Sequence, residues 1–237
     1  MIQLLISAAV AAAAPPAAAP APAAVSCPDV VTPDALVCRA LEAQKNGDPE
    51  GAARGFEEAA QASSDTEPAK ARMWAAAGNM WLAADQPGKA ALDLDRALAL
   101  KGLEAEQRGE ALLDRARAAE ATNDLKTARA KLNEAAASIS DDPFYWYFSA
   151  ALAIREGDKA TAETAINRAL TMAPADPAVL FEAGHVAHFA GDDDKARSYW
   201  MRAAGSDPNG AVGKAAAKAV EMLGVTPTVK TETQPPK

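Results

Sequence analysis

The chain has very few of the side chains on which most catalytic and metal sites depend. Its 237 residues include only two histidines and two cysteines. The sequence also lacks a Gly-rich phosphate loop, a His-Glu-x-x-His motif and a Gly-x-Ser-x-Gly motif. We therefore expect neither a buried nucleophilic triad nor a four-ligand zinc site, and we predict no catalytic residue, no cofactor and no bound metal.

Clustered basic charge and long apolar runs are missing as well. The formal net charge is −8, and lysine and arginine nowhere form the dense patch that binding to a phosphate backbone requires. The apolar run at the N-terminus ends at Pro15, after about 13 residues, and is too short to cross a bilayer. We expect neither a nucleic-acid partner nor a transmembrane span in the mature protein.

The first 24 residues differ in kind from the rest. They are apolar and then rich in alanine and proline, without a charged side chain. This composition is typical of a bacterial secretory signal followed by a spacer, and Ala-x-Ala cleavage sites end at Ala13 and Ala23. We expect 1–24 to be signal peptide and spacer, and the mature protein to be periplasmic or secreted. The alternative is an Ala/Pro arm on a cytoplasmic protein.

Regular repetition is the main feature of the remaining chain. Gly-Asp or Asn-Asp, followed by alanines on either side of a bulky residue, recurs at one constant interval in three copies that begin at Asn123, Gly157 and Gly191. Two earlier copies are each offset by a slightly longer interval. The Gly-Asp or Asn-Asp pair is expected to end one helix and cap the next. Such helical hairpins must stack on one another to bury their apolar faces.

The first helix of a unit also places a bulky residue four positions before a small one, as in Trp74 and Gly78. This spacing resembles the tetratricopeptide repeat, a 34-residue helix-turn-helix unit. The resemblance implies an all-α, right-handed superhelical solenoid of about five such repeats plus a C-terminal capping helix. We place the solenoid at 25–224, with repeats at 33–66, 71–104, 109–142, 143–176 and 177–210 and the capping helix at 211–224.

The sequence also predicts the structure of the extra residues in the earlier repeats and of the C-terminal segment. The four extra residues of the earlier repeats are expected in the connections 63–69 and 102–108, because loops tolerate insertions. The segment 225–237 is dominated by threonine, proline and lysine, and we expect it to be a disordered tail.

The two cysteines bear on the compartment of the protein. Cys27 precedes the first helix and Cys38 lies on it. In an oxidising compartment, a disulfide between them would hold the entering chain on the first hairpin and would stabilise it by about 3 kcal/mol in the chain-entropy model. The alternative is two unrelated thiols.

Five consecutive aromatic residues, 144–148, distinguish the fourth repeat. A helix distributes five consecutive residues around its axis, so they cannot all be core. We expect Trp146 to take the packing position and Tyr145 to lean on the preceding hairpin. By analogy with the inner helices of tetratricopeptide repeats, Phe144, Tyr147 and Phe148 are then expected on the concave side. The alternative is that the aromatic residues only pack the third repeat against the fourth.

The family resemblance implies that proteins or peptides bind along the concave face. Asn79 matches one position of the family's carboxylate clamp, but Ala75 stands where a lysine is needed, so the clamp is not predicted. The predicted groove consists of Arg72, Asn79, Leu113, Arg117, Phe144, Tyr147, Phe148, Arg155, Phe181, His185 and His188.

The predicted function is a non-catalytic protein- or peptide-binding scaffold of the bacterial cell envelope. One alternative is a cytoplasmic scaffold of the same construction. Another is a metal-dependent ligand binder or enzyme that uses Glu182, His185 and His188, which are three residues apart on one helix. The acidic run 192–194 lies at a helix start, where capping is favoured over a calcium site.

Overall fold

The computed structural model describes residues 27–63 and 67–224, and these residues form helices and no strand. The expected signal peptide and spacer (1–24) and the expected tail (225–237) lie outside the described residues. No helix within the described ranges has the length and the apolar character needed to cross a bilayer.

Ten of the described helices pair into five hairpins, and an eleventh follows them. The hairpins are α1 (Pro33–Lys45) with α2 (Pro49–Ala62), α3 (Glu67–Ala83) with α4 (Pro87–Ala99), α5 (Ala105–Ala121) with α6 (Leu125–Ile139), α7 (Pro143–Glu156) with α8 (Lys159–Met172), and α9 (Pro177–Phe189) with α10 (Asp193–Ser206). The last helix, α11 (Ala211–Gly224), packs against α10 and α9. The predicted all-α solenoid of five hairpins and a capping helix is therefore confirmed.

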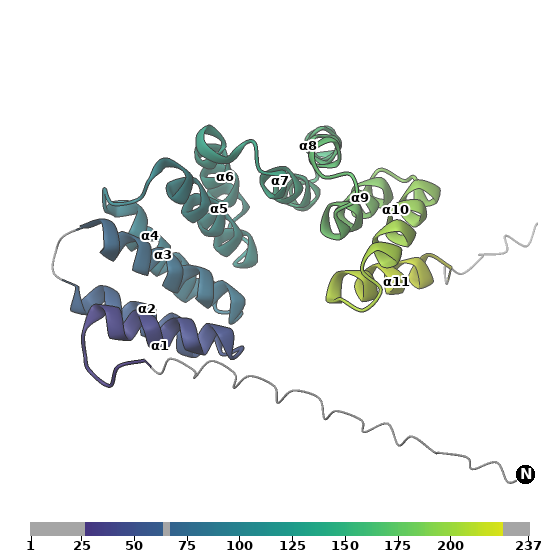
Figure 1. Cartoon of the computed structure of the whole chain (residues 1–237). Helices are drawn as coiled ribbons and strands as arrows, with labels where there is room; N and C mark the ends of the chain where they lie inside the picture. The colour runs from purple at the N-terminus through teal and green to yellow at the C-terminus, as the bar shows by residue number, and fades with distance from the viewer. Residues whose placement is uncertain (1–26, 64–66, 225–237) are drawn as a thin grey trace, which may run out of the picture.

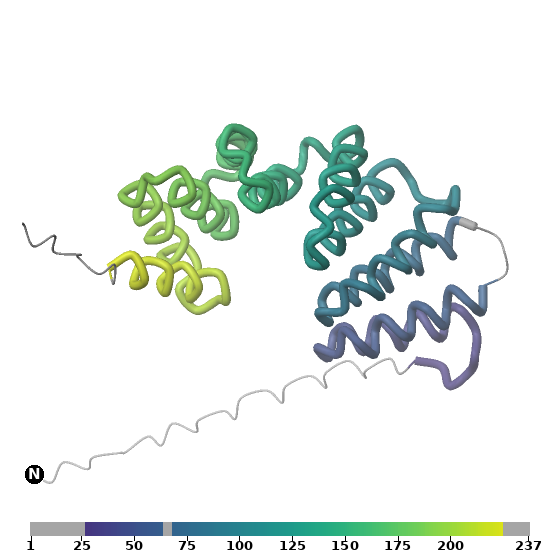
Figure 2. Tube along the Cα trace, turned by 180° about the vertical axis from the view of Figure 1, so that it is seen from behind, coloured from purple at the N-terminus to yellow at the C-terminus, as the bar shows by residue number. Residues whose placement is uncertain are grey.

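The hairpins follow one another around an open arch, with α1 and α11 at its two ends (Figures 1 and 2). In the second half of the arch, α7 and α9 lie on the inner side and α8 lies on the outer side (Figure 1). In this half the first helices of the hairpins thus face the hollow of the arch, which is where a binding surface is expected in a curved solenoid (Figure 1).

Each hairpin turn has the same backbone conformation. The last turn residue has a positive φ, between 56° and 86°, and the next N–H donates to the carbonyl five residues back at 2.8–2.9 Å. Glycine or asparagine suits this left-handed conformation, and Asp85 adopts it in the second hairpin. The positive-φ residues are Gly47, Asp85, Asn123, Gly157 and Gly191.

An aspartate caps the second helix of four of the five hairpins. The carboxylates of Asp48, Asp124, Asp158 and Asp192 each accept a hydrogen bond from the backbone N–H three residues on, at 2.8–3.1 Å. Gln86 takes this position in the second hairpin and makes no side-chain cap. The prediction that Gly-Asp or Asn-Asp ends one helix and caps the next is confirmed.

A small residue of the first helix meets a bulky residue of the second helix in each hairpin. A Cβ atom added to Gly184 would lie 2.2 Å from Nε1 of Trp200, and one added to Gly78 would lie 2.5 Å from Cγ of Leu94. The other three hairpins have alanine at this position, in the same core cluster as a bulky residue of the second helix. These pairs are Ala40 with Phe56, Ala116 with Leu132, and Ala150 with Ile166.

The extra residues of the second and third repeats are helical, so their expected placement in loops is wrong. Helices α3 and α5 have 17 residues each, whereas the other helices have 13–15. The segment 105–108 consists of strong helix formers, and Glu104 and Gln107 form a capping box in front of it. Local helix propensity therefore adds one N-terminal turn to α5.

The disulfide between Cys27 and Cys38 is present, with the two Cα atoms 5.6 Å apart. Arg39 reinforces this connection, because its guanidinium donates to the carbonyl oxygens of Pro28 at 2.6 Å and Val30 at 3.1 Å. The segment that enters the first hairpin is thus held covalently and by hydrogen bonds against α1.

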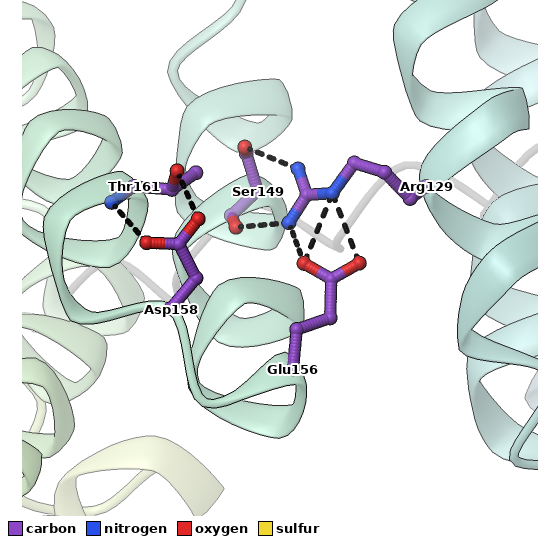
Figure 3. A network of polar contacts seen from close by, with 5 residues as sticks. All are labelled: Arg129, Ser149, Glu156, Asp158 and Thr161. Atoms are coloured by element: carbon purple, nitrogen blue, oxygen red, sulfur yellow. Dashed lines mark hydrogen bonds and ion pairs between the residues drawn. The ribbon is translucent and has the colours of Figure 1, made fainter.

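Polar contacts join the third hairpin to the fourth. The guanidinium of Arg129, on α6, binds the carboxylate of Glu156 at 2.5–3.1 Å and donates to the hydroxyl of Ser149 at 3.2 Å, both on α7 (Figure 3). Beside this network, Asp158 caps α8 and accepts a further hydrogen bond from the Thr161 hydroxyl at 2.6 Å (Figure 3).

Candidate functional site

A cavity of about 870 Å³ lies along the first helices of the first four hairpins. Its walls come from α1, α3 and α5 and from the beginning of α7, with Phe56 of α2 and Leu103 completing it. Four helices that are far apart in the sequence therefore contribute to one concave surface. A cavity of this size is large enough for several side chains of a bound segment.

The wall residues recur at the repeat spacing. Residues i, i+3 and i+7 lie on one side of a helix, so equal positions in successive first helices fall beside one another along the solenoid. The cavity is built from three such rows: Asp34, Arg72, Glu110 and Phe144; Val37, Ala75 and Leu113; and Leu41, Asn79 and Arg117.

Two large apolar side chains remain exposed at this surface. Leu41, on α1, is 52% exposed, and Phe144, on α7, is 38% exposed. Between them the cavity is lined by the methionines Met73 and Met80. Methionine side chains adapt to irregular partners, and exposed apolar groups in a concave surface are typical of binding sites.

Part of the polar lining is already engaged. The Asp114 carboxylate accepts a hydrogen bond from the side-chain amide of Asn79 at 2.7 Å. It also forms an ion pair with the Arg117 guanidinium at 2.8 Å. The Arg117 guanidinium also lies 5.6 Å from the centre of the Phe144 ring. These contacts fix the position of Phe144 relative to α5, and they occupy the asparagine that resembles a clamp residue.

The other four charged groups of the lining form no ion pair with the described residues, and all four side chains are exposed. They are the Arg72 guanidinium and the carboxylates of Asp34, Glu110 and Asp142. Burial, followed by the nearby carboxylates of Glu106, Asp114 and Asp142, raises the pKa of Glu110. The surroundings of Glu110 are therefore electronegative.

The cavity brings together five of the predicted groove residues: Arg72, Asn79, Leu113, Arg117 and Phe144. Leu113 is buried and contributes to the wall without being exposed. Phe148 is corrected, because it is only 7% exposed and packs in the core with Tyr145 and Leu152. Those three residues form the i, i+3, i+7 row of α7 that leans on α5 and α6, so Tyr145 contacts the preceding hairpin as expected.

Trp146 does not occupy a fully buried packing position. It is half-buried and packs against the core clusters of both the third and the fourth hairpin, and its Nε1 donates to the carbonyl oxygen of Ser140 at 2.7 Å. The aromatic run therefore contributes both to packing between hairpins and to the cavity wall. Tyr145 and Phe148 pack the third hairpin against the fourth, and Phe144 faces the cavity.

Tyr147, Phe181 and His185 have the same register as the cavity residues but do not line it. Helices α7 and α9 pack directly on each other, and Tyr147 packs against the core cluster that they share, whereas Phe181 packs against the cluster of α9, α10 and α11. Burial is the main cause that raises the pKa of Tyr147, with the Glu182 carboxylate next. The Phe181 and His185 ring centres are 4.4 Å apart, and His185 lies 5.5 Å from Trp200.

The two histidines use different carboxylates. Nδ1 of His185 lies 3.2 Å from Oε2 of the buried Glu182, whereas Nδ1 of His188 lies 2.6 Å from Oδ1 of Asp193, on α10. Within 27–63 and 67–224 there is no group of three or more His, Cys, Asp or Glu residues that could hold a metal ion. The proposed meeting of Glu182, His185 and His188 at one cation is thus not seen in the described residues.

Arg155 also lies away from the cavity. It forms an ion pair with Glu120, at the end of α5, and donates to Oδ1 of Asn123 at 3.0 Å. Arg155 therefore joins α7 to the turn of the third hairpin.

The apolar wall on α1 was not among the predicted groove residues. Val37 and Leu41 lie one repeat before Ala75 and Asn79 and have the same register. The repeat spacing alone would have identified both residues. Met73 and Met80, in contrast, lie between the rows, and no pattern in the sequence marks them.

Comparisons with known proteins agree with this architecture. The family model described as "Tetratricopeptide repeat" matches residues 96–199. Among solved structures, PilW, described as a widely conserved type IV pilus biogenesis factor, is 17% identical with a TM-score of 0.65, over 80% of this chain and 84% of that one. Among curated proteins, none matches this chain.

Two further solved structures show the same fold at similar distance. YrrB, described as a TPR protein with an unusual peptide-binding site, is 17% identical with a TM-score of 0.54, over 78% of this chain and 91% of that one. The MamA protein is 17% identical with a TM-score of 0.56, over 73% of this chain and 90% of that one.

Proposed function

Because the chain is a tetratricopeptide repeat protein, we propose that it is a non-catalytic scaffold that binds a protein or peptide segment in the cavity along α1, α3, α5 and α7. One observation carries the proposal: Leu41 and Phe144 expose large apolar side chains into a cavity that four helices form together. YrrB, of the same fold, is described as having a peptide-binding site.

The binding energy is expected to come mainly from these apolar side chains. Burial of a leucine or phenylalanine side chain is worth about 1.5–3 kcal/mol, so loss of both should weaken binding by at least about tenfold. The lining methionines Met73 and Met80 would adjust around the partner's side chains.

The test is a matched pair of double variants. Short peptides are selected from a random phage-displayed library on the full chain, and their affinity is measured by fluorescence anisotropy. Leu41→Ala with Phe144→Ala should weaken binding at least about tenfold. The control is Leu92→Ala with Phe189→Ala, which removes the same side-chain types at 62% and 38% exposure outside the cavity.

Equal binding by the two double variants would refute a binding site in this cavity. Far-ultraviolet circular dichroism of both proteins checks that their helix content is unchanged. Because all four side chains are exposed, neither variant is expected to lose more than about 1 kcal/mol of stability.

We place the protein in the bacterial cell envelope as part of the same proposal. The Cys27–Cys38 disulfide supports an oxidising compartment. The uncharged, alanine-rich N-terminal sequence supports export. N-terminal sequencing of the protein from its native cells should show a start beyond Ala13, whereas an intact Met1 would contradict export.

A further inference from the structure

The charges that line the cavity are unbalanced. Four carboxylates and two guanidinium groups face it. One of the two guanidinium groups, that of Arg117, is neutralised by its ion pair with Asp114. Among the described residues, Arg72 is then the sole cation of the lining without an ion-pair partner, against Glu110, Asp34 and Asp142.

Glu110 is the carboxylate best placed to meet a bound segment. Its neighbours are Asp114, which already accepts two hydrogen bonds, and Asp142, whose Oδ1 caps α7 by accepting from the Phe144 N–H at 2.9 Å. The side chain of Glu110 has no such partner in the described part of the chain, and it is set among other carboxylates. Like charges in a partly desolvated cavity repel one another, and a cation between them removes that repulsion.

The apolar and acidic features lie next to each other. Glu110 and Phe144 belong to the same row of the cavity wall and are one repeat apart in the sequence. A ligand that contacts Phe144 therefore lies close to Glu110 as well. Lysine and arginine combine a long apolar stem with a charged end, so their side chains suit a wall of this kind.

We infer that the cavity selects a peptide segment with a lysine or arginine side chain beside its apolar side chains, and that Glu110 receives the cationic group. This inference rests on the proposed function, because it requires the cavity to be the binding site. Charge complementarity determines the choice of partner. Arg117 and Arg155, two of the arginines predicted for the groove, are both in ion pairs with carboxylates of the chain itself.

The test compares peptides selected on three forms of the full chain from the random phage-displayed library. The unaltered chain should enrich peptides that combine lysine or arginine with apolar residues. Glu110→Lys should abolish that basic preference. Glu58→Lys, an equal change of charge at an exposed position on α2 outside the cavity lining, should keep it.

Affinities provide a second measurement. For the tightest basic peptide, Glu110→Gln should weaken binding at least about fivefold, and Glu58→Gln should change it less than about twofold. Added salt should weaken binding to the unaltered chain more than binding to Glu110→Gln, because screening acts on the removed charge pair.

The outcomes separate this inference from the proposed function. Peptides that require Leu41 and Phe144 but show acidic enrichment or no charge preference would overturn the inference and leave the proposed function standing. Peptides that bind without these two side chains, or a library without binders, would overturn both. Analytical ultracentrifugation tests whether a second copy of the chain occupies the cavity. A dimer that is lost in the Leu41→Ala with Phe144→Ala variant would identify that second copy as the occupant and would also overturn the inference.

Discussion

Replacement of Gly184 by alanine should destabilise the last hairpin, although alanine is the better helix former. The added Cβ would lie 2.2 Å from Nε1 and 2.3 Å from Cδ1 of Trp200. The indole is buried, and its Nε1 donates to the carbonyl oxygen of Phe181 at 2.9 Å. The ring therefore has little freedom to move away from a methyl group.

The magnitude follows from two opposing effects. Alanine in place of glycine in a helix stabilises by about 0.5–1 kcal/mol. An extra methyl group in a well-packed core costs about 1–3 kcal/mol. We expect overpacking to dominate at Gly184, with a net loss of about 1–2 kcal/mol. Gly205→Ala, on α10, is the control, because no atom lies within 4 Å of its added Cβ, so it should gain up to about 1 kcal/mol.

A compensating substitution tests the mechanism. The third hairpin pairs Ala116 with Leu132 at the equivalent positions. Gly184→Ala combined with Trp200→Leu should therefore be more stable than the sum of the two single losses predicts, by at least about 1 kcal/mol in a double-mutant cycle.

Urea unfolding followed by circular dichroism measures the total stability of each variant. Hydrogen exchange in α9 and α10 is measured in parallel, because hairpins of a solenoid can unfold separately. Stabilisation by Gly184→Ala equal to that by Gly205→Ala would refute the packing argument, as would additive losses in the double variant.

Three further predictions concern stability elsewhere in the chain. Burial, followed by the adjacent Glu57 carboxyl group, raises the pKa of Asp93 from 3.8 to about 7. Asp93 therefore costs the folded state progressively more as the pH rises from about 4 to about 7, so Asp93→Asn should stabilise the chain more at about pH 8 than at about pH 5, by at most about 3 kcal/mol in urea titrations. An equal effect at both pH values would contradict this. Reduction of the Cys27–Cys38 disulfide should cost up to about 3 kcal/mol, and an unchanged melting temperature would be inconsistent with its role. Asp85→Gly should gain up to about 1 kcal/mol in thermal unfolding, because Asp85 has a φ of 56°; a loss would count against the turn analysis.

The order of the hairpins could be predicted from the sequence because its signals are local and repeated. Turn residues such as Gly157 and Asp158 end one helix and cap the next, and pairs such as Gly184 and Trp200 fix how the two helices cross. Each repeat carries these signals independently, so a departure in one repeat, such as Gln86, does not alter the fold.

The extra turn of α5 was predicted incorrectly for a physical reason. The repeat spacing places a unit at Gly109, but the preceding segment 105–108 has its own helix propensity and capping box. The insertion therefore lengthens the helix where a loop was expected.

The extent of the cavity could be predicted only in part. Register selected Arg72, Asn79 and Arg117, and these three residues do line the cavity. It also selected Tyr147 and Phe181, which pack against the core clusters of the last two hairpins and do not line the cavity. Whether two neighbouring first helices separate or touch depends on the crossing geometry of whole hairpins, and the sequence of one helix does not contain that information.

The central claim, that the cavity along α1, α3, α5 and α7 holds the partner, is tested most directly by the methionine methyl groups. Met73 and Met80 line the cavity, whereas Met172, Met201 and Met222 lie on α8, α10 and α11. In a nuclear magnetic resonance titration of methyl-labelled protein with a selected peptide, we predict that the methyl signals of Met73 and Met80 shift. The methyl signals of the other three methionines should not shift. Shifts confined to Met172, Met201 or Met222 would contradict the account.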